Sequence, residues 1–544
     1  MRTLACSQWN QQRVRSTVLP FGIFLIIGFV LLPFYRYELD PDTISYLSIA
    51  EQYVAGYWKE AINAYWGPLY SWCVALPLSL HVPAAVALKA VDLGAGILAL
   101  FALQRFSASR EISAGMRNTV LWVGVPIVLG FAMEANTPDL LFTALLLLYL
   151  GITFDPKYPS FAGSGIVCGL LGALAYLAKS YGFFFFTGHF LLFSAIAWGK
   201  EMDSHRRRRI AQHSLGGLAI FYLTSFAWMA GLHAKYGKWM LGTAGDFNYR
   251  LVGPESSGYP HFRHLLSPTS EHATTAWQDP SPAWLPPWSA FTSRADFTHQ
   301  AKLVFKNTKD VLKFWLYIAP LFPLFLVAYP LLCLTSPSKN TEWRFLMLTI
   351  VLFSSGYLFV TAQYRYFWLT GLLLLWIAFR TLDLAFQKFA LAAPLRLVVI
   401  SATVLSFLLA PVRTLRGQFL RDRDLYSWSE TIRRSLHVRG RLASCGNWND
   451  SAYLAYVLRM PYYGVATPEA DADEVARELN PDYRASRHPI DRKQISSELS
   501  GAQIDYFIEW PSCGPESLQP YSTVAQAGDI KLTRAHQANG NLPK

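Results

Sequence analysis

Long runs of apolar residues limit the fold of this chain more than any other feature. The first run, residues 17–35, has no charged residue and is long enough to cross a bilayer as a helix. A shorter apolar segment, 69–82, is read as the first part of a broken second element. We expect eleven spans, at residues 17–35, 84–106, 116–133, 138–154, 161–178, 182–199, 213–232, 312–334, 343–362, 364–380 and 395–412.

The composition agrees with a polytopic α-helical membrane protein. Hydrophobic residues make up 52% of the 544 residues and charged residues only 15%, against about 25% charged residues in ordinary soluble proteins. The net charge is +12. Because the basic residues are concentrated in particular loops, membrane orientation and anionic lipid explain this charge, and we expect no nucleic-acid partner.

The basic residues also predict the orientation of the chain. Residues 1–16 contain three arginines and no acid, which is typical of an uncleaved anchor with a cytoplasmic N-terminus. With eleven spans, the loops that carry most basic residues all fall on the cytoplasmic side. The basic residues of these loops are Arg105, Arg110, Arg117, Lys200, Arg206–Arg209, Lys339, Arg344, Arg380 and Lys388. We expect an integral protein of the bacterial inner (plasma) membrane.

The opposite, extracytoplasmic side then receives most of the unusual polar residues. These lie in residues 36–68, Glu134–Asp139, Lys179–Tyr181, the long loop 233–311, Gln363–Arg365 and everything after Arg413. Their common side indicates a functional site there. The loop 233–311 is too long to be a passive connector, and we expect it to bind a ligand or to act as a lid. Its polar residues His261, Arg263, His264 and His272 are read as surface residues.

Residues 36–68 carry Asp40 and Asp42 where the chain leaves the first span. A helix with apolar positions on one side follows, and then a group of Tyr and Trp, which favours a helix lying flat at the membrane interface. Asp42 has two possible roles. It could be the N-cap of this helix, or it could be a general base that takes a proton from an acceptor while a phosphate leaving group departs.

This region resembles the first external loop of the GT-C fold glycosyltransferases, in particular the protein O-mannosyltransferases and the lipid A aminoarabinose transferases. The resemblance rests on Asp42-x-x-x-Tyr46, Ile49-Ala50, Gly56, Trp58 and Trp66-Gly67-Pro68-Leu69-Tyr70. In these families an acid on this loop, usually in an Asp-Glu pair, is the catalytic base. Matching the tyrosine places that acid on Asp42, and because Thr43 replaces the Glu, Asp40 is the candidate second carboxylate.

Three further segments extend the resemblance, in the same order along the chain. They are Thr137-Pro138-Asp139-Leu140-Leu141, Tyr176-Leu177-Ala178-Lys179-Ser180 and Gln363-Tyr364-Arg365-Tyr366. Asp139 either caps its helix or, with Glu134 nearby, orients the acceptor or holds a divalent cation. Lys179 and Arg365 either reach lipid headgroups or hold the phosphate of the donor, with Tyr364 beside them. No cofactor is certain.

After residue 412 the long hydrophobic runs end. Residues 413–544 are expected to form a small extracytoplasmic α/β domain, with strands at 441–445 and 504–510 and helices at 451–459 and 471–479. Residues 1–412 would form the catalytic membrane domain. Cys445 and Cys513 are the two cysteines predicted outside, where disulfides persist. We expect these two cysteines to pair.

The sequence thus predicts a GT-C type membrane enzyme. It would move a sugar from a polyprenyl-phosphate carrier to an acceptor lipid, glycan or protein, by direct displacement with inversion and Asp42 as base. Two alternatives remain open. A transporter or flippase of lipid-linked sugars would need charges along a path through the membrane interior, whereas here the charges stay at the edges. A non-catalytic scaffold would not depend on the acids.

Overall fold

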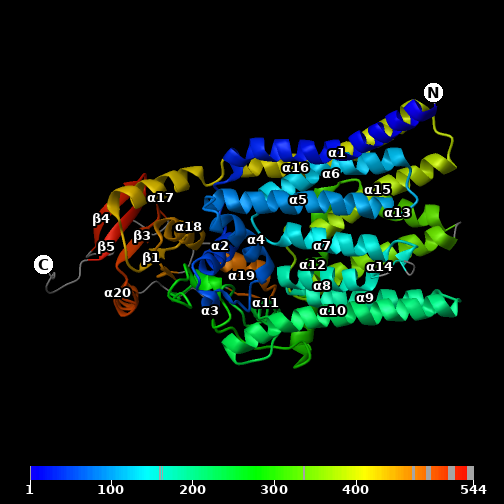
Figure 1. The fold of residues 1–544 in the computed structure, drawn as a ribbon. Helices are drawn as coiled ribbons and strands as arrows, with labels where there is room; N and C mark the ends of the chain where they lie inside the picture. Colours follow the sequence, from blue (N-terminus) through cyan, green and yellow to red (C-terminus); the bar gives the residue numbers. More distant parts are fainter. Residues whose placement is uncertain are drawn as a thin grey trace.

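The computed structural model describes residues 2–158, 161, 163–334, 337–467, 472–484, 492–511 and 521–535. Long helices run side by side and form a bundle, with the N-terminus at one end (Figure 1). A small sheet near the C-terminus lies beyond the other end, which is called the sheet end below.

Helices stand at each of the predicted spans. Their bounds are α1 (Arg2–Tyr35), α5 (Ala84–Ala108), α6 (Ala114–Glu134), α7 (Asp139–Thr153), α8 (Ser164–Ala178), α9 (Tyr181–Lys200), α10 (Ser204–Tyr236), α12 (Arg294–Ile318), α13 (Phe322–Cys333), α14 (Pro337–Leu358), α15 (Trp368–Lys388) and α16 (Ala393–Gln418). Among the described residues, seven helical stretches are long and apolar enough to cross a membrane, or up to eight if a bent pair counts as one. The chain is therefore an integral membrane protein, but the count of eleven is not confirmed.

Two parts of the predicted span pattern differ from the structure. The expected span 312–334 is broken, because α12 and α13 meet at an angle of 93°. The apolar segment 69–82 is a separate helix, α4 (Pro68–Ser79), and residues 80–83 separate it from α5. Proline explains part of both breaks. Pro83 precedes α5, and Pro320 lies between α12 and α13. Proline has no backbone N–H to donate to the preceding turn, so a helix cannot continue regularly through it.

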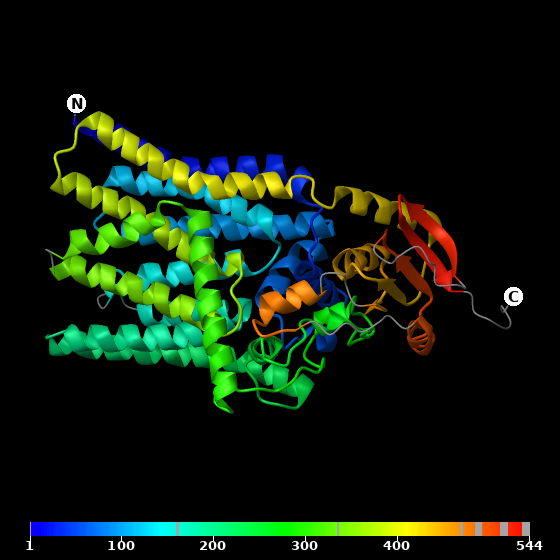
Figure 2. The ribbon, with the colours of Figure 1, turned by 180° about the vertical axis from the view of Figure 1, so that it is seen from behind.

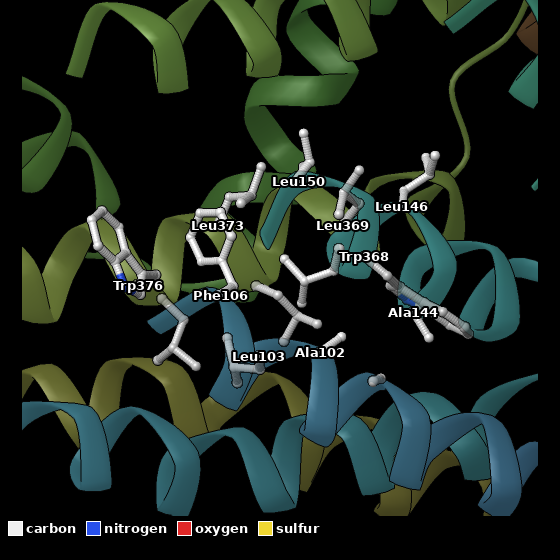
Figure 3. Close-up of a cluster of buried hydrophobic side chains, with 14 of the residues drawn as sticks. Ala102, Leu103, Phe106, Ala144, Leu146, Leu150, Trp368, Leu369, Leu373 and Trp376 are labelled. Carbon is white, nitrogen blue, oxygen red and sulfur yellow. The ribbon is translucent and has the colours of Figure 1, made fainter. Parts of the chain in front are cut away.

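The core of the bundle is centred on α15, whose residues from Trp368 to Leu384 are all buried. Figure 3 shows Trp368, Leu373 and Trp376 of this helix among buried side chains of α5 and α7. The Phe131 ring stacks on Trp368 with their centroids 4.5 Å apart. Because α15 is packed on all sides, its first residues hold a fixed position relative to the rest of the bundle.

Short helices gather at the sheet end of the bundle (Figure 1). Gly67 shows how closely they pack, because a Cβ at this residue would lie 2.5 Å from the carbonyl oxygen of Leu177, at the end of α8. The predicted loop 233–311 is shorter than expected, since α10 extends to Tyr236 and α12 begins at Arg294. The short helices at the sheet end are α2 (Pro41–Val54), α3 (Trp58–Ala61), α4, α11 (Ala244–Leu251), η2 (Pro260–Phe262), η3 (Ala276–Gln278) and η4 (Tyr364–Phe367).

The C-terminal region folds into the expected mixture of strands and helices. A five-stranded sheet has the order β2-β1-β3-β5-β4, in which β1 is parallel to β2 and β3, and β5 is antiparallel to β3 and β4. The predicted strands are β1 and β3, and the predicted helices are α18 and α19. The elements are α17 (Arg423–Leu436), β1 (Leu442–Cys445), α18 (Trp448–Leu458), β2 (Tyr462–Val465), α19 (Ala472–Leu479), α20 (Arg492–Gly501), β3 (Tyr506–Glu509), β4 (Tyr521–Ala527) and β5 (Ile530–Ala535).

This C-terminal region is attached to the long loop between α10 and α12 by backbone hydrogen bonds. The amide of Tyr462 donates to the carbonyl of Thr274 at 2.8 Å, and the amide of Leu266 donates to Tyr463 at 2.6 Å. The predicted domain boundary at 412/413 stays a prediction, and α16 continues past it to Gln418. Cys445 is disulfide-bonded. Its predicted partner, Cys513, lies outside the described residues, so this pairing also stays a prediction.

Candidate active site

The two aspartates that follow the first span have different roles in the structure. Asp40 is the N-cap of α2, because its Oδ1 accepts a hydrogen bond of 2.7 Å from the amide of Thr43, and Pro41 begins the helix. The capping role considered for Asp42 is therefore wrong. Asp42 lies in the first turn of α2, where its Oδ1 accepts a hydrogen bond of 2.9 Å from Nε1 of Trp277.

Arg365 brings three carboxylates from distant parts of the sequence together. It lies in η4, just before the buried helix α15. Its guanidinium forms an ion pair with Asp42 and also lies 3.6 Å from Oδ2 of Asp40 and 3.7 Å from Oδ2 of Asp139. The side chain of Arg365 is 17% exposed, so the group is shielded but reachable.

Asp139 links Arg365 to the second cation. Its Oδ1 lies 2.6 Å from Nζ of Lys179, and its Oδ2 accepts a hydrogen bond of 2.8 Å from the hydroxyl of Thr137. The Lys179 ammonium also lies 3.4 Å from the centroid of the Tyr366 ring, a cation–π contact. Asp40, Asp42, Asp139, Lys179 and Arg365 therefore form one connected group, called the sheet-end cluster below.

The surroundings of the sheet-end cluster change the proton affinities of its members. Burial lowers the pKa of Lys179 to about 8, although the neighbouring Asp139 opposes this shift. Burial raises the pKa of Asp40, and the negative charge of Asp42 adds to this effect while Arg365 acts against it. Perturbed ionisable groups of this kind are frequent in functional sites.

Two predicted site residues lie beside the cluster without joining its ion pairs. Glu134, the last residue of α6, is close enough to interact electrostatically with Arg365 and Asp139, and its buried Oε2 has no hydrogen-bond partner among the described residues. Tyr364 turns its ring toward Tyr317, with centroids 5.0 Å apart. Its role as a phosphate ligand stays a prediction, whereas Tyr366, which was not predicted, contacts Lys179.

A network of hydrogen bonds joins the two loops that carry the acids. The amide nitrogen of Asn136 donates to both the carbonyl and the carboxylate of Glu38, at 3.0 and 2.9 Å. The hydroxyl of Thr43 donates to the carbonyl of Asn136 at 3.3 Å. Because Asn136 lies between Glu134 and Asp139, this network fixes the distance between the Asp40–Asp42 turn and Asp139.

The sequence did not reveal the aromatic support of Asp42. Trp277 lies in η3 of the long loop, and His261 packs between Trp277 and Trp448, with ring centroids 4.6 and 4.4 Å away. The prediction that His261 is a surface residue is wrong, since it is 6% exposed, and burial lowers its pKa to about 3. Three rings in contact thus connect α18 of the C-terminal region to Asp42, and no spacing in the sequence predicts this contact.

Two pockets lie near the cluster. The first is almost entirely apolar and lies between α6, α16 and the end of α12, with Tyr364, the neighbour of Arg365, in its wall. The second lies in the long loop, and its lining includes Trp277, which donates a hydrogen bond to Asp42 of the cluster. Its lining combines aromatic rings and prolines with polar groups, namely Phe247, Pro260, His261, Leu266, Ser267, Thr269, Ala276, Trp277, Asp279, Pro280, Pro282 and Ala283.

The carboxylates do not form a metal site of the usual kind. In the part of the chain that the structure describes, no group of three or more His, Cys, Asp or Glu side chains is placed to hold a metal ion. The guanidinium of Arg365 lies between the carboxylates of Asp40, Asp42 and Asp139, in the position that a cation would take.

Comparisons with known proteins agree with this architecture. No protein-family model matches the sequence, and no curated protein sequence is significantly similar. One solved structure, ArnT from Cupriavidus metallidurans bound to undecaprenyl phosphate, matches with a TM-score of 0.58 and 14% identity, over 95% of this chain and 97% of that one. ArnT is a lipid A aminoarabinose transferase with the GT-C fold. The present chain has the GT-C fold.

Two further structures match less well. ArnT from the same organism in the apo state matches with a TM-score of 0.49 and 16% identity, over 97% of this chain and 98% of that one. The Archaeoglobus fulgidus oligosaccharyltransferase in the apo form matches with a TM-score of 0.49 and 10% identity, over 90% of this chain and 69% of that one. The match to the ArnT complex and the C-terminal sheet confirm the expectation of a GT-C membrane architecture with a small C-terminal α/β region.

Proposed function

We propose that this protein is a membrane glycosyltransferase that moves a sugar from a polyprenyl-phosphate carrier to an acceptor hydroxyl or amine at the sheet end of the bundle. The observation that carries this proposal is the set of contacts made by Arg365. One guanidinium faces three carboxylates, stays partly exposed, and lies near a second cation, Lys179. Such a group can exchange a carboxylate for the phosphate of a donor.

The donor phosphate and Asp42 compete for the same partner. Guanidinium binds phosphate, as it binds carboxylate, through two parallel hydrogen bonds. When the phosphate takes Arg365, the Asp42 carboxylate is released from its ion pair but keeps the hydrogen bond to Trp277. Donor binding would therefore prepare the base, so Asp42 becomes reactive only when a donor is present.

The transfer step follows from these positions. The Asp42 carboxylate takes the proton from the acceptor, whose oxygen or nitrogen forms a bond to the anomeric carbon from the face opposite the phosphate. The bond between the anomeric carbon and the phosphate oxygen breaks, and its electron pair stays on the phosphate. Arg365 and Lys179 stabilise the added negative charge on the departing polyprenyl phosphate. The configuration at the anomeric carbon is inverted.

The apolar pocket between α6 and α16 supports a donor with a hydrocarbon chain. Its lining residues Gly130 and Phe131 lie one turn before Glu134, so the pocket approaches the charged cluster from the membrane side. Undecaprenyl phosphate is bound in the structure of ArnT, which has the same fold. For the acceptor, the pocket on the other side of Trp277 combines aromatic rings with a few polar groups, which is the lining that ligand pockets use.

The expected cellular arrangement supports the same donor class. In the predicted orientation the sheet end faces away from the cytoplasm of a bacterial inner membrane, where nucleotide sugars are not available. A lipid-linked sugar can still reach this side within the membrane. The acceptor would be a lipid, glycan or protein presented there, and either Asp40 or Asp139 would be the second carboxylate of the site.

The test is transfer from lipid-linked sugars by purified Asp42→Asn protein. Asparagine keeps the shape of the side chain and the contact with Trp277 but cannot accept the proton, so we expect turnover to fall by about 10²–10⁴-fold. The matched control is Asp246→Asn, which removes the charge of an exposed aspartate that forms an ion pair with Arg250. Turnover of Asp42→Asn close to that of the control would remove Asp42 from the mechanism.

A further inference from the structure

Helix α12 is oriented differently from the long helices of the bundle. It runs across the bundle near the sheet end, as the upright green helix in Figure 2, whereas the long helices lie along the bundle. The next helix, α13, turns by 93° to run along the bundle. Because α12 has 25 residues and runs across the membrane-spanning helices, we expect it to lie in the plane of the membrane.

One face of α12 holds it firmly against the bundle. The side-chain amide of Asn307 donates to the carbonyls of Leu358 and Val360, at 2.9 and 3.3 Å, and Gln300 donates to Phe359 at 3.2 Å. Trp315 donates its indole N–H to Thr370 at 3.0 Å. These bonds fix the depth of α12 and attach it to the segment that leads to Arg365.

The outward face of α12 carries two parallel stripes. Phe297, Phe305, Leu312 and Leu316 form an apolar stripe whose side chains are 59%, 64%, 45% and 45% exposed. Lys302, Lys306, Lys309 and Lys313 recur every three or four residues and form a basic stripe beside it. An amphipathic helix with lysines next to exposed phenylalanine and leucine is typical of a membrane interface.

The contacts of the basic stripe establish which stripe faces the membrane. Nζ of Lys302 lies 2.6 Å from Oδ1 of Asp482, in the C-terminal region, and His299 bonds to the other oxygen of Asp482 at 2.8 Å. The lysines therefore face the side that carries the C-terminal region. The apolar stripe lies on the flank away from Asp482, toward the level of the hydrocarbon.

We propose that the basic stripe of α12 binds the headgroups of anionic phospholipids in the leaflet at the sheet end. The helix has five basic residues and two acidic ones. Asp310 is shared between Lys306 and Lys313, and Lys313 is still 72% exposed. Among the described residues, Lys309 has no acid within ion-pair distance, and its ammonium lies 4.1 Å from the centroid of the Phe305 ring, at the border of the two stripes.

The charge and the position of the stripe together identify this partner. Lysines at the level of the headgroups attract anionic lipid, and the phosphate of each headgroup accepts hydrogen bonds from an ammonium group. A neutral headgroup offers no net charge to match the surplus of α12. Because α12 is hydrogen-bonded to the segment before Arg365, a lipid bound to α12 would lie on the helix that supports one side of the candidate active site.

The test compares lipid binding by the purified full-length protein. Native mass spectrometry in detergent would measure the retention of phosphatidylglycerol relative to phosphatidylcholine with the same acyl chains. We expect the wild-type protein to retain phosphatidylglycerol better than phosphatidylcholine. In the double variant Lys309→Gln/Lys313→Gln, the ratio of the two retentions should be about tenfold smaller. The control is Lys531→Gln/Arg534→Gln on β5, which lies far from the bundle (Figure 1) and should leave the preference unchanged.

A charge-preserving variant separates binding from folding. Lys309→Arg/Lys313→Arg should keep the preference for phosphatidylglycerol, and all variants should elute as the wild type in size-exclusion chromatography. The proposal is overturned if Lys309→Gln/Lys313→Gln keeps the wild-type preference. It is also overturned if that variant loses both lipids equally, because the contact would then be apolar and not electrostatic.

Discussion

Two groups of buried charges lie near opposite ends of the same helix, and they differ in a way that separates function from structure. The sheet-end cluster surrounds Arg365, just before α15. The second group, called the far-end cluster, surrounds Arg380 within α15, whose Nε lies 3.2 Å from Glu342 and whose Nη1 lies 3.5 Å from Asp383. Tyr329 completes it with a hydrogen bond of 2.6 Å to Glu342.

The far-end cluster is closed to solvent and the sheet-end cluster is not. The side chains of Arg380, Glu342 and Asp383 are only 2%, 8% and 6% exposed. Those of Arg365, Asp42 and Asp40 are 17%, 18% and 29% exposed, and two of the Arg365 contacts are longer than 3.5 Å. A closed, fully paired cluster can only hold helices together, whereas an open one with spare acceptors can change partners when a ligand arrives.

The largest expected difference between the clusters is in activity. Arg365→Gln removes the charge that would bind the donor phosphate and stabilise it as it leaves, so we expect kcat/KM to fall by about 10³-fold. The measurement is steady-state transfer from a lipid-linked sugar, with Arg250→Gln, an exposed ion-pair partner of Asp246, as the control. A loss below about threefold would remove the phosphate-binding role of Arg365.

The matching change in the far-end cluster should affect stability instead. Arg380→Met leaves Glu342 and Asp383 buried without their cation, which costs about 3–5 kcal/mol. Thermal unfolding in detergent would show this loss, while kcat/KM per folded molecule should stay near the wild-type value. The double variant Arg380→Met/Glu342→Met should recover part of the stability. An inactive but stable Arg380→Met protein would reverse the assignment of the two clusters.

The effect of pH should reveal Lys179 in the sheet-end cluster. Its pKa is lowered to about 8 by burial, so the ammonium is present below this pH and is lost as the pH rises through it. Donor binding needs the cation, and kcat/KM should therefore fall above pH 8. Well above this pH, the fall should approach about tenfold for each pH unit. Lys179→Arg keeps its charge throughout this range. A profile that falls equally in Lys179→Arg would exclude Lys179 as the titrating group.

The smallest expected effect concerns the support of Asp42. Trp277→Phe keeps the ring that packs on His261 but removes the hydrogen bond to Oδ1 of Asp42. A hydrogen bond to a charged acceptor contributes about 1.5–3 kcal/mol. Because the Asp42 side chain is partly exposed, we expect the lower end of this range, which is a fall in kcat of about tenfold. Trp288→Phe is the control, because Trp288 donates to the carbonyl of Tyr249 in the same loop. Equal losses in both variants would show a general effect of the loop.

The sequence predicted the helices well because their signal is local. A run such as that of α15 has a single stable backbone in lipid, and the acids and cations at its ends follow from where the run stops. The common side of Asp42, Asp139, Lys179 and Arg365 was therefore predictable. The break between α12 and α13 was less so, because Pro320 lies inside a segment whose overall hydropathy fits one continuous span.

Other features depend on contacts between distant segments. Asp42 and Trp277 are separated by 235 positions, and nothing near either residue marks the pair. The same holds for His261, which looked like a loop residue and is enclosed by Trp277 and Trp448. The capping role considered for Asp42 belongs to Asp40 because Pro41 starts the helix two residues earlier than that role requires.

The most direct test of the central claim is a structure of the full-length protein with undecaprenyl phosphate. The account predicts the phosphate at the sheet-end cluster, with its oxygens about 3 Å from the nitrogens of Arg365 and Lys179. Asp42 should then have left Arg365 and should face the phosphate from the acceptor side. A phosphate bound elsewhere, with the Asp42–Arg365 ion pair intact, would contradict the account.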